Sequence, residues 1–139
     1  MRRTLFKKTR LTEAKKLTRY LDKICSEYVR KRAMKRVGGC ERCLSKKKSW
    51  KDLDWAHFHG RANKHVRWDD RNGAGLCGGC HFYLDGDPLQ KIEFFEKLLG
   101  ENEFTMLECQ AYRGTKPDKE ALILYYEQKL KEENNVRNV

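Results

Sequence analysis

The stretch Leu76-Cys77-Gly-Gly-Cys80-His81 places two cysteines two residues apart, and Cys40-Glu-Arg-Cys43 has the same spacing, with 33 residues between the pairs. A two-residue gap lets one tight turn point both thiolates at one ion, and two such turns complete a tetrahedral sulfur site. Zinc is the common redox-inert ion for four thiolates. We therefore expect a structural Zn²⁺ held by Cys40, Cys43, Cys77 and Cys80. Two redox dithiols or buried core cysteines are the alternative.

The charge of the chain is uneven. Its 139 residues include 31 Lys and Arg against 20 Asp and Glu, a formal net charge of +11. Residues 1–51 hold 19 basic and 4 acidic residues, whereas residues 52–139 hold 12 and 16. A basic first third favours a polyanionic partner, most simply nucleic acid, although a solvated helix face explains a charge run equally well.

Two features argue against a membrane or secreted protein. The longest apolar run, Ala121 to Tyr126, has six residues, far short of the roughly 20 that a membrane span needs. The start of the chain has no apolar stretch that could serve as a signal peptide. We expect a cytoplasmic protein in a reducing compartment, where disulfides are a poor default. The remaining thiols, Cys25 and Cys109, are expected to be small buried hydrophobes.

Helices are predicted on both sides of the cysteine segment. An apolar stripe at three- and four-residue steps predicts a basic helix that starts at Thr12 and ends at Gly38. Asp87-Pro88 starts another helix, which Gly100 ends. A last helix is expected over roughly 117–134, either covering the core or forming the seam of a homodimer. Residues 101–114 are ambiguous, and 50–59 read as an extended segment.

Between the cysteine pairs, His57 falls in a strand-like stretch, Asn72 in the following loop and His81 at the head of a helix. Such residues can converge in a ββα arrangement that holds one divalent ion for phosphodiester hydrolysis. The chemistry needs a base near neutral pH, a hard cation and a group that orients the base. Each residue also has a structural reading: a satisfied histidine, a turn cap before Gly73, and a hydrogen bond to a zinc-bound sulfur.

Three stretches carry a family resemblance: Asp54-Trp-Ala-His-Phe-His59, Val66-Arg-Trp-Asp-Asp-Arg-Asn72 and Leu76 to His81. Together they resemble the HNH (His-Me finger) nucleases, most closely the NinG/Rap group of phage recombination endonucleases, over roughly residues 20–100. The resemblance implies an α+β fold with a small zinc-stapled ββα-metal core flanked by α-helices, in a bacterial or phage-infected cell. We expect one domain over 1–139, made of a basic amino-terminal helix (1–38), the zinc-stapled HNH core (39–87), carboxy-terminal helices (88–134) and a frayed tail (135–139).

The resemblance also implies roles for single residues. His57 matches the general base, Asn72 the residue that orients it, and His81 a ligand of a catalytic Mg²⁺ or Mn²⁺ ion. HNH nucleases often carry Asp or His directly before the base, where this chain has Ala56. The substitutes for that missing ligand are Asp54, His59 and Asp85.

The resulting expectation is a metal-dependent DNA endonuclease that leaves a 5′ phosphate and a 3′ hydroxyl, acting on branched DNA in recombination. The alternative is a zinc-dependent nucleic-acid-binding module without catalysis, which the alanine before His57 favours, and RNA stays open as the partner. The residues expected to bind nucleic acid are Lys15, Lys16, Arg19, Arg61, Lys64 and Arg67.

Overall fold

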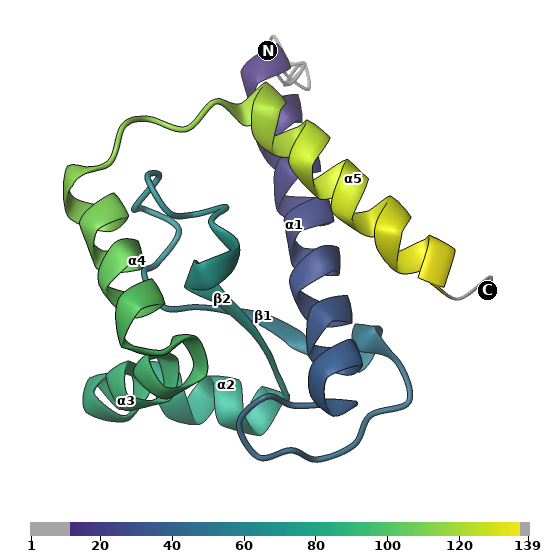
Figure 1. The fold of residues 1–139 in the computed structure, drawn as a ribbon, viewed down its shortest axis with the longest axis vertical. Helices are drawn as coiled ribbons and strands as arrows, with labels where there is room; N and C mark the ends of the chain where they lie inside the picture. The colour runs from purple at the N-terminus through teal and green to yellow at the C-terminus, as the bar shows by residue number, and fades with distance from the viewer. Residues whose placement is uncertain (1–11, 137–139) are drawn as a thin grey trace, which may run out of the picture.

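A computed structural model describes residues 12–136, which form five α-helices and one two-stranded antiparallel sheet (Figure 1). The chain is therefore α+β, as expected. Residues 1–11 of the predicted first helix and 137–139 of the predicted tail lie outside the described residues. The elements are α1 (Glu13–Val37), β1 (Asp54–His57), β2 (Gly73–Leu76), α2 (Gly78–Asp85), α3 (Pro88–Leu99), α4 (Glu101–Arg113) and α5 (Lys119–Val136), with short 3-10 turns at Trp50–Asp52 and Asp70–Asn72.

The ends of α1 confirm the predicted start and stop signals. The Thr12 hydroxyl accepts a hydrogen bond from the backbone N–H of Lys15, which caps the first turn. Gly38 adopts a left-handed conformation with φ 70° and donates its N–H to the carbonyl of Met34. The predicted stripe is buried at Leu21 and Ile24, and this side of the helix packs on the sheet and on α5.

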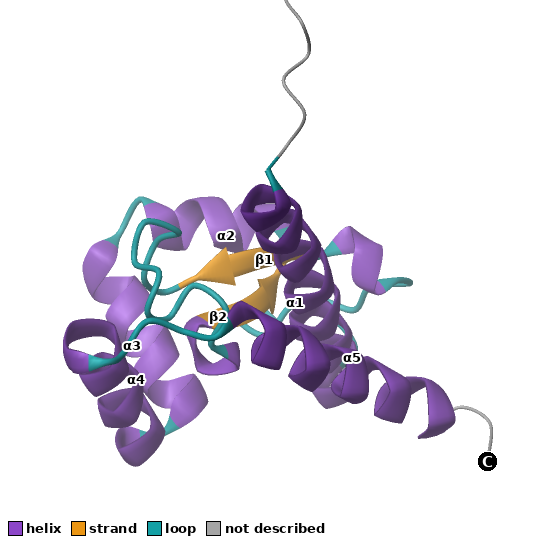
Figure 2. Ribbon diagram, turned by 90° about the horizontal axis from the view of Figure 1, so that it is seen from above, coloured by secondary structure: helices purple, strands orange, loops and turns teal. Residues whose placement is uncertain are grey.

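The two strands form a hairpin with helices on both faces (Figure 2). Side chains alternate along a strand, so Trp55 and His57 share one face and Ala56 lies on the other. Trp55 packs in the cluster made by α1 and α5, whereas Ala56 packs with Leu84 of α2 and Phe95 of α3. The hairpin therefore separates an α1–α5 layer from an α2–α3 layer.

Close packing of α1 on β2 requires glycine at position 75. A Cβ atom there would lie 2.6 Å from the Cβ of Ala33 on α1. Only glycine lets the helix approach the strand this closely.

Three segments differ from the sequence expectation. Of the ambiguous residues 101–114, all but Gly114 form α4, which begins directly after Gly100 breaks α3 with φ 84°. The stretch expected to be extended over 50–59 divides into a 3-10 turn and β1. The last helix starts at Lys119 rather than 117, because the carboxylate of Asp118 caps the backbone N–H groups of Glu120 and Ala121.

The expectation for the two unpaired cysteines is half correct. Cys25 is fully buried in α1, as expected. Cys109 is exposed, so the prediction of a buried position is wrong. The buried residues of α4 are Leu107 and Ala111, and a residue two positions from each points to the opposite side of a helix. None of the helices within residues 12–136 is long and apolar enough to cross a membrane.

Candidate functional site

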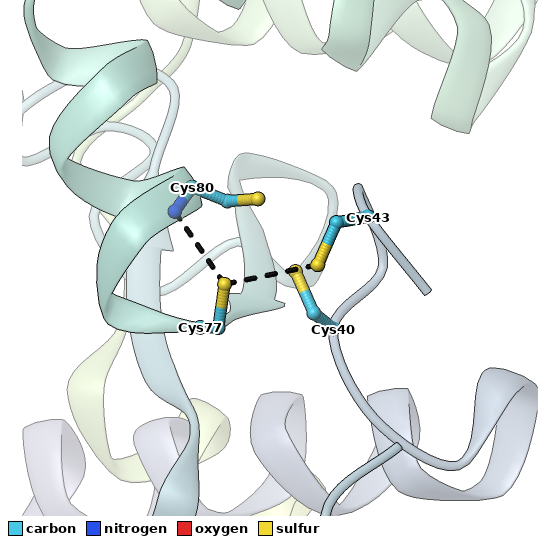
Figure 3. A group of neighbouring side chains, drawn as sticks. All are labelled: Cys40, Cys43, Cys77 and Cys80. Atoms are coloured by element: carbon cyan, nitrogen blue, oxygen red, sulfur yellow. Dashed lines mark hydrogen bonds between the residues drawn. The ribbon is translucent and has the colours of Figure 1, made fainter. Parts of the chain in front are cut away.

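The four paired cysteines converge on one point (Figure 3). Their sulfur atoms all lie within 4.8 Å of one another, and those of Cys43 and Cys77 are 3.8 Å apart. A tetrahedral zinc with Zn–S bonds of about 2.3 Å separates its sulfurs by about 3.8 Å. All four thiols are free rather than joined in disulfides. The donor set and its spacing therefore fit a structural zinc held by the residues that the sequence singled out.

Backbone hydrogen bonds build the first cysteine turn. The N–H of Leu44 donates to the carbonyl of Cys40, and the N–H of Cys40 donates to the carbonyl of Ser45. Gly39 is required beside this turn, because a Cβ atom there would lie 1.9 Å from the carbonyl oxygen of Ser45. The backbone hydrogen bonds and the glycine at position 39 therefore determine the shape of this turn.

Glu41, between the first two cysteines, joins that turn to the hairpin. Its backbone N–H donates to the Gly75 carbonyl at 3.0 Å, and its carboxylate accepts the Gly75 N–H at 2.8 Å. Its side chain is only 1% exposed and also accepts a hydrogen bond from Arg36 at 3.4 Å. Because Gly75 lies in β2, two residues before Cys77, these bonds set the distance between the cysteine pairs.

The thiols lie in different electrostatic surroundings. Hydrogen bonding to Ser45 lowers the pKa of Cys43 to about 6. Burial raises the pKa of Cys80 to about 12, although the Arg42 guanidinium, 3.4 Å from its sulfur, acts in the opposite direction. Neither Arg42 nor Ser45 was predicted from the sequence, since their signal is only a position inside the first Cys-x-x-Cys pair and two residues after it.

His57 ends β1 on the face of the hairpin that α1 covers. Its Nε2 atom is buried and has no hydrogen-bond partner among residues 12–136, and its ring lies 4.1 Å from that of Trp55. Burial, followed by the nearby charge of Arg61, lowers the pKa of His57 to about 4. The ring is therefore a neutral imidazole at physiological pH, with an unused nitrogen that can accept a proton.

Asn72 is fully buried and clamps the chain directly after His57. Its amide oxygen accepts the backbone N–H of His59 at 2.8 Å, and its amide nitrogen donates to the carbonyl of His59 at 3.0 Å. Its own carbonyl accepts the N–H of Phe58 at 2.9 Å. These contacts reach the backbone of residues 58–59 rather than the His57 ring.

His81 lies on α2, on the other side of the hairpin from His57, between two carboxylates. Its Nδ1 atom is 3.0 Å from an oxygen of Asp54, and its Nε2 atom is 3.2 Å from an oxygen of Asp85. Lys91 of α3 contacts the other oxygen of Asp85 at 3.0 Å. Asp54 and Asp85, two of the three residues expected to replace the missing metal ligand, thus contact His81, but at opposite nitrogens of its ring.

His59, the third substitute ligand, has a different partner. Its Nε2 atom is 2.6 Å from a carboxylate oxygen of Glu108 on α4, and its ring meets the edge of Tyr112. Glu108 was not singled out from the sequence, since 49 residues separate it from His59.

The six basic residues expected to bind nucleic acid lie in three kinds of surroundings. Three of them, Lys15, Arg19 and Lys64, line one hollow. Others have partners within the protein: Lys16 pairs with Glu13 at 3.2 Å, and Arg67 pairs with Asp22 at 2.7 Å. Arg61 is exposed, with its guanidinium 6.0 Å from the centre of the Trp55 ring.

Comparison with protein-family models, with curated proteins and with solved structures gave no match to this chain.

Proposed function

We propose that this chain is a metal-dependent endonuclease of the HNH type that hydrolyses phosphodiester bonds in DNA. The observation that carries the proposal is the buried, unpartnered Nε2 atom of His57 at the end of β1. A buried polar atom without a partner costs about 1–3 kcal/mol, and such strongly perturbed groups cluster at functional sites. The succession of β1, β2 and α2 beside the four-cysteine site supports a zinc-stapled ββα core.

In this proposal His57 accepts a proton from the attacking water. The negative charge of a bound phosphodiester raises the pKa of His57 from about 4 toward neutrality, where a base is most effective. Asn72 is a positioning residue, because it fixes the backbone at His59 and so the end of the strand that carries the base.

The placement of His57 and His81 on opposite faces of the hairpin counts against a site in which both contact one phosphate. The proposal therefore assigns the activation of water to His57, and the cleavage assay has to test the contribution of His81 and its carboxylates. When bound, Mg²⁺ or Mn²⁺ would supply positive charge to the pentavalent phosphate.

The carboxylates around His81 fit that ion by donor type, but the arrangement of the cluster does not fit it. Carboxylate oxygens suit both Mg²⁺ and Mn²⁺, whereas an imidazole nitrogen suits softer ions such as Zn²⁺. Asp54 and Asp85, however, contact opposite nitrogens of the His81 ring, so the three groups do not meet at one point. The requirement for the ion rests on the family resemblance and has to be tested directly.

A second candidate function is a zinc-dependent DNA-binding module without catalysis. The specific observation in its favour is that both ring nitrogens of His81 are already engaged by carboxylates. Ala56, where HNH nucleases often have a metal ligand, favours it as well.

Cleavage assays decide between the two. Zinc-loaded protein is incubated with supercoiled plasmid, linear duplex and four-way junction DNA, with and without Mg²⁺ or Mn²⁺. We expect ion-dependent cutting by the wild type, and cutting about 10²- to 10⁴-fold slower by His57→Ala with DNA binding retained. His65→Ala is the matched control, because the Nδ1 atom of this imidazole in the following loop is also buried and without a hydrogen-bond partner among residues 12–136, and the variant should cut like the wild type.

Each negative result has its own meaning. If the wild type binds these substrates but cuts none of them with either ion, the protein is the binding module. If His57→Ala cuts as fast as the wild type, the nuclease proposal survives but His57 is not its base. Faster cutting of the junction than of linear duplex would support a role on branched DNA.

A further inference from the structure

A hollow of about 450 Å³ lies where three distant segments of the chain meet. Its walls come from the amino-terminal end of α1, the loop between the strands and the first residue of α5. Figure 1 shows α5 starting beside that end of α1. Four cations line it, Lys15, Arg19, Lys64 and Lys119, together with Ala14, Thr18 and Asp22.

The one acid among these lining residues has its charge already balanced. The carboxylate of Asp22 accepts hydrogen bonds from Arg67 at 2.7 and 3.1 Å and from the Trp68 indole at 2.8 Å. The Lys119 ammonium donates to a neutral group, the Thr18 hydroxyl, at 2.9 Å. The four cations that line the hollow therefore keep their charge.

Three other lysines of α1 have acidic partners. Lys16 contacts Glu13, Lys31 contacts Glu27, and Lys35 contacts Glu133 of α5 at 3.3 Å. Two of the four cations, Lys15 and Arg19, come from the basic first third, and the fold adds Lys64 and Lys119 from later in the chain. Four like charges held close together repel one another, and a bound anion relieves that repulsion.

We propose that this hollow seats backbone phosphate of DNA and holds the strand beside His57. The first turn of α1 adds the partial positive charge of a helix amino terminus, since Lys15 and Thr18 lie near that end. Asp22, which lines the hollow, and Arg67, which pairs with it, are also among the charges that act on His57. No aromatic ring is among the lining residues to stack on a base, so the site suits backbone rather than nucleobase.

The choice of DNA as the ligand rests on the proposed function, but the test does not depend on cleavage. Binding of a fluorescent duplex is measured without added Mg²⁺ or Mn²⁺ over a range of salt concentrations. The variant carries Arg19→Gln, Lys64→Gln and Lys119→Gln. We expect binding roughly tenfold weaker or more, and a slope of log affinity against log salt that is smaller by about 2 to 3.

The matched control removes the same charge from exposed positions outside the hollow, with Lys48→Gln, Lys97→Gln and Lys131→Gln. It should keep nearly the wild-type slope. Equal loss in both triple variants would overturn the proposal in favour of a general charge effect, and unchanged binding in the hollow variant would overturn it outright.

Two further measurements complete the test. If the triple variant does not fold, the single variant Lys64→Gln replaces it, since Lys64 is at an exposed loop position. This variant should lower the slope of log affinity against log salt by about 1. An unchanged slope would contradict the proposal that the hollow binds backbone phosphate. Inorganic phosphate at the same phosphate concentration should not displace the duplex, because one ion replaces only one of several contacts. Full displacement would show a pocket for small anions instead of a seat for the DNA backbone.

Discussion

Two side-chain clusters meet at the start of α2, and they are assembled to different degrees. Cys77 and Cys80 belong to four thiols whose sulfurs lie within 4.8 Å of one another. The next residue, His81, contacts Asp54 and Asp85 only pairwise, at opposite nitrogens of its ring. The first cluster is ready for a metal ion, whereas the second would have to rearrange to hold one.

The difference follows from what holds each cluster in place. The cysteine turns are fixed by backbone hydrogen bonds and by Glu41, whose side chain is only 1% exposed. The side chains of His81, Asp54 and Asp85 are 31%, 50% and 51% exposed. Ion pairs at such exposure contribute only about 0–1 kcal/mol. A metal at the cysteines is therefore part of folding, while the His81 cluster can respond to a ligand.

The largest predicted effect on stability comes from a substitution that disrupts the four-cysteine site. Cys77→Ser leaves three thiolates, and metal binding at such sites is coupled to folding by about 10–16 kcal/mol. Because a whole domain is stable by only about 5–15 kcal/mol, we expect the variant to lose most of its helix content. Circular dichroism and elemental analysis, with one zinc per wild-type chain, provide the measurement.

Cys109→Ser is the control for that experiment, since this thiol is exposed on α4 and lies outside the four-cysteine site. It should melt like the wild type. A metal-free wild-type chain with full helicity and a sharp thermal transition would show that the site does not support the fold.

The next effect concerns pH and His57, which contacts neither cluster. Burial lowers its pKa to about 4 from an ordinary value of 6.5. Between these values the unfolded chain binds more protons than the folded one, so the free energy of unfolding falls as pH drops from 6.5 toward 4. With about 1.4 kcal/mol per pKa unit, the loss from this group is at most about 3 kcal/mol.

Urea unfolding at pH 7 and pH 5 measures this loss. His57→Gln keeps all four thiols but cannot titrate, so its stability should fall less than that of the wild type over the same interval. Equal falls in the two proteins would mean that His57 titrates normally in the folded state. Titration of the ring by NMR gives an independent value, and it should rise when DNA binds.

Asn72→Ala should come next in size. It leaves the buried N–H and C=O of His59 without their partner, at a cost of about 1–3 kcal/mol in the free energy of unfolding. Asn102→Ala, an exposed change on α4, is the control and should change stability by less than about 0.5 kcal/mol. If Asn72→Ala lowers the free energy of unfolding no more than the control does, the hydrogen bonds of Asn72 to His59 do not stabilise the backbone there.

Local signals were sufficient for the parts of the fold that local interactions determine. Thr12, Gly38 and Asp87 mark helix ends because each acts on backbone groups within a few residues. The Cys-x-x-Cys spacing predicted the four-cysteine site for the same reason. Each turn holds its own pair, and the meeting of the two turns follows once both bind one ion.

Contacts between distant segments could not be predicted in this way. Lys119 reaches Thr18 across 101 residues, and His59 reaches Glu108 across 49. Neither pair has a spacing or a motif that one sequence reveals. Helix α4 was ambiguous because only Leu107 and Ala111 are buried on it, which is too short a stripe to establish helical periodicity.

A smaller effect is expected at the His81 cluster. Asp54→Asn removes one of its carboxylate charges, and because the groups are half-exposed the free energy of unfolding should change by less than about 1 kcal/mol. Thermal melting at low and high salt measures it, and the difference from the wild type should shrink as salt screens the pair. A loss above about 2 kcal/mol would place this cluster with the cysteines as part of the folded framework.

The smallest predicted effect is a gain in stability from a substitution in the first cysteine turn. Leu44 directly follows Cys43, has φ 62°, and is 56% exposed, so it contributes little packing to offset a left-handed backbone. That conformation costs a residue with a Cβ atom about 1–2 kcal/mol. Glycine avoids this cost, but its greater conformational freedom in the unfolded chain offsets about 0.5–1 kcal/mol of the gain. Leu44→Gly should therefore raise the free energy of unfolding by about 0.5 kcal/mol, measured by urea titration of the zinc-loaded protein.

Ser45→Gly, one residue on, has no such strain to relieve and loses the hydrogen bond to Cys43, so it should lower stability. A loss in both variants would mean that the turn depends on the Leu44 side chain as well as on its backbone, and that the cysteine cluster is less fully shaped by backbone hydrogen bonds than its geometry indicates.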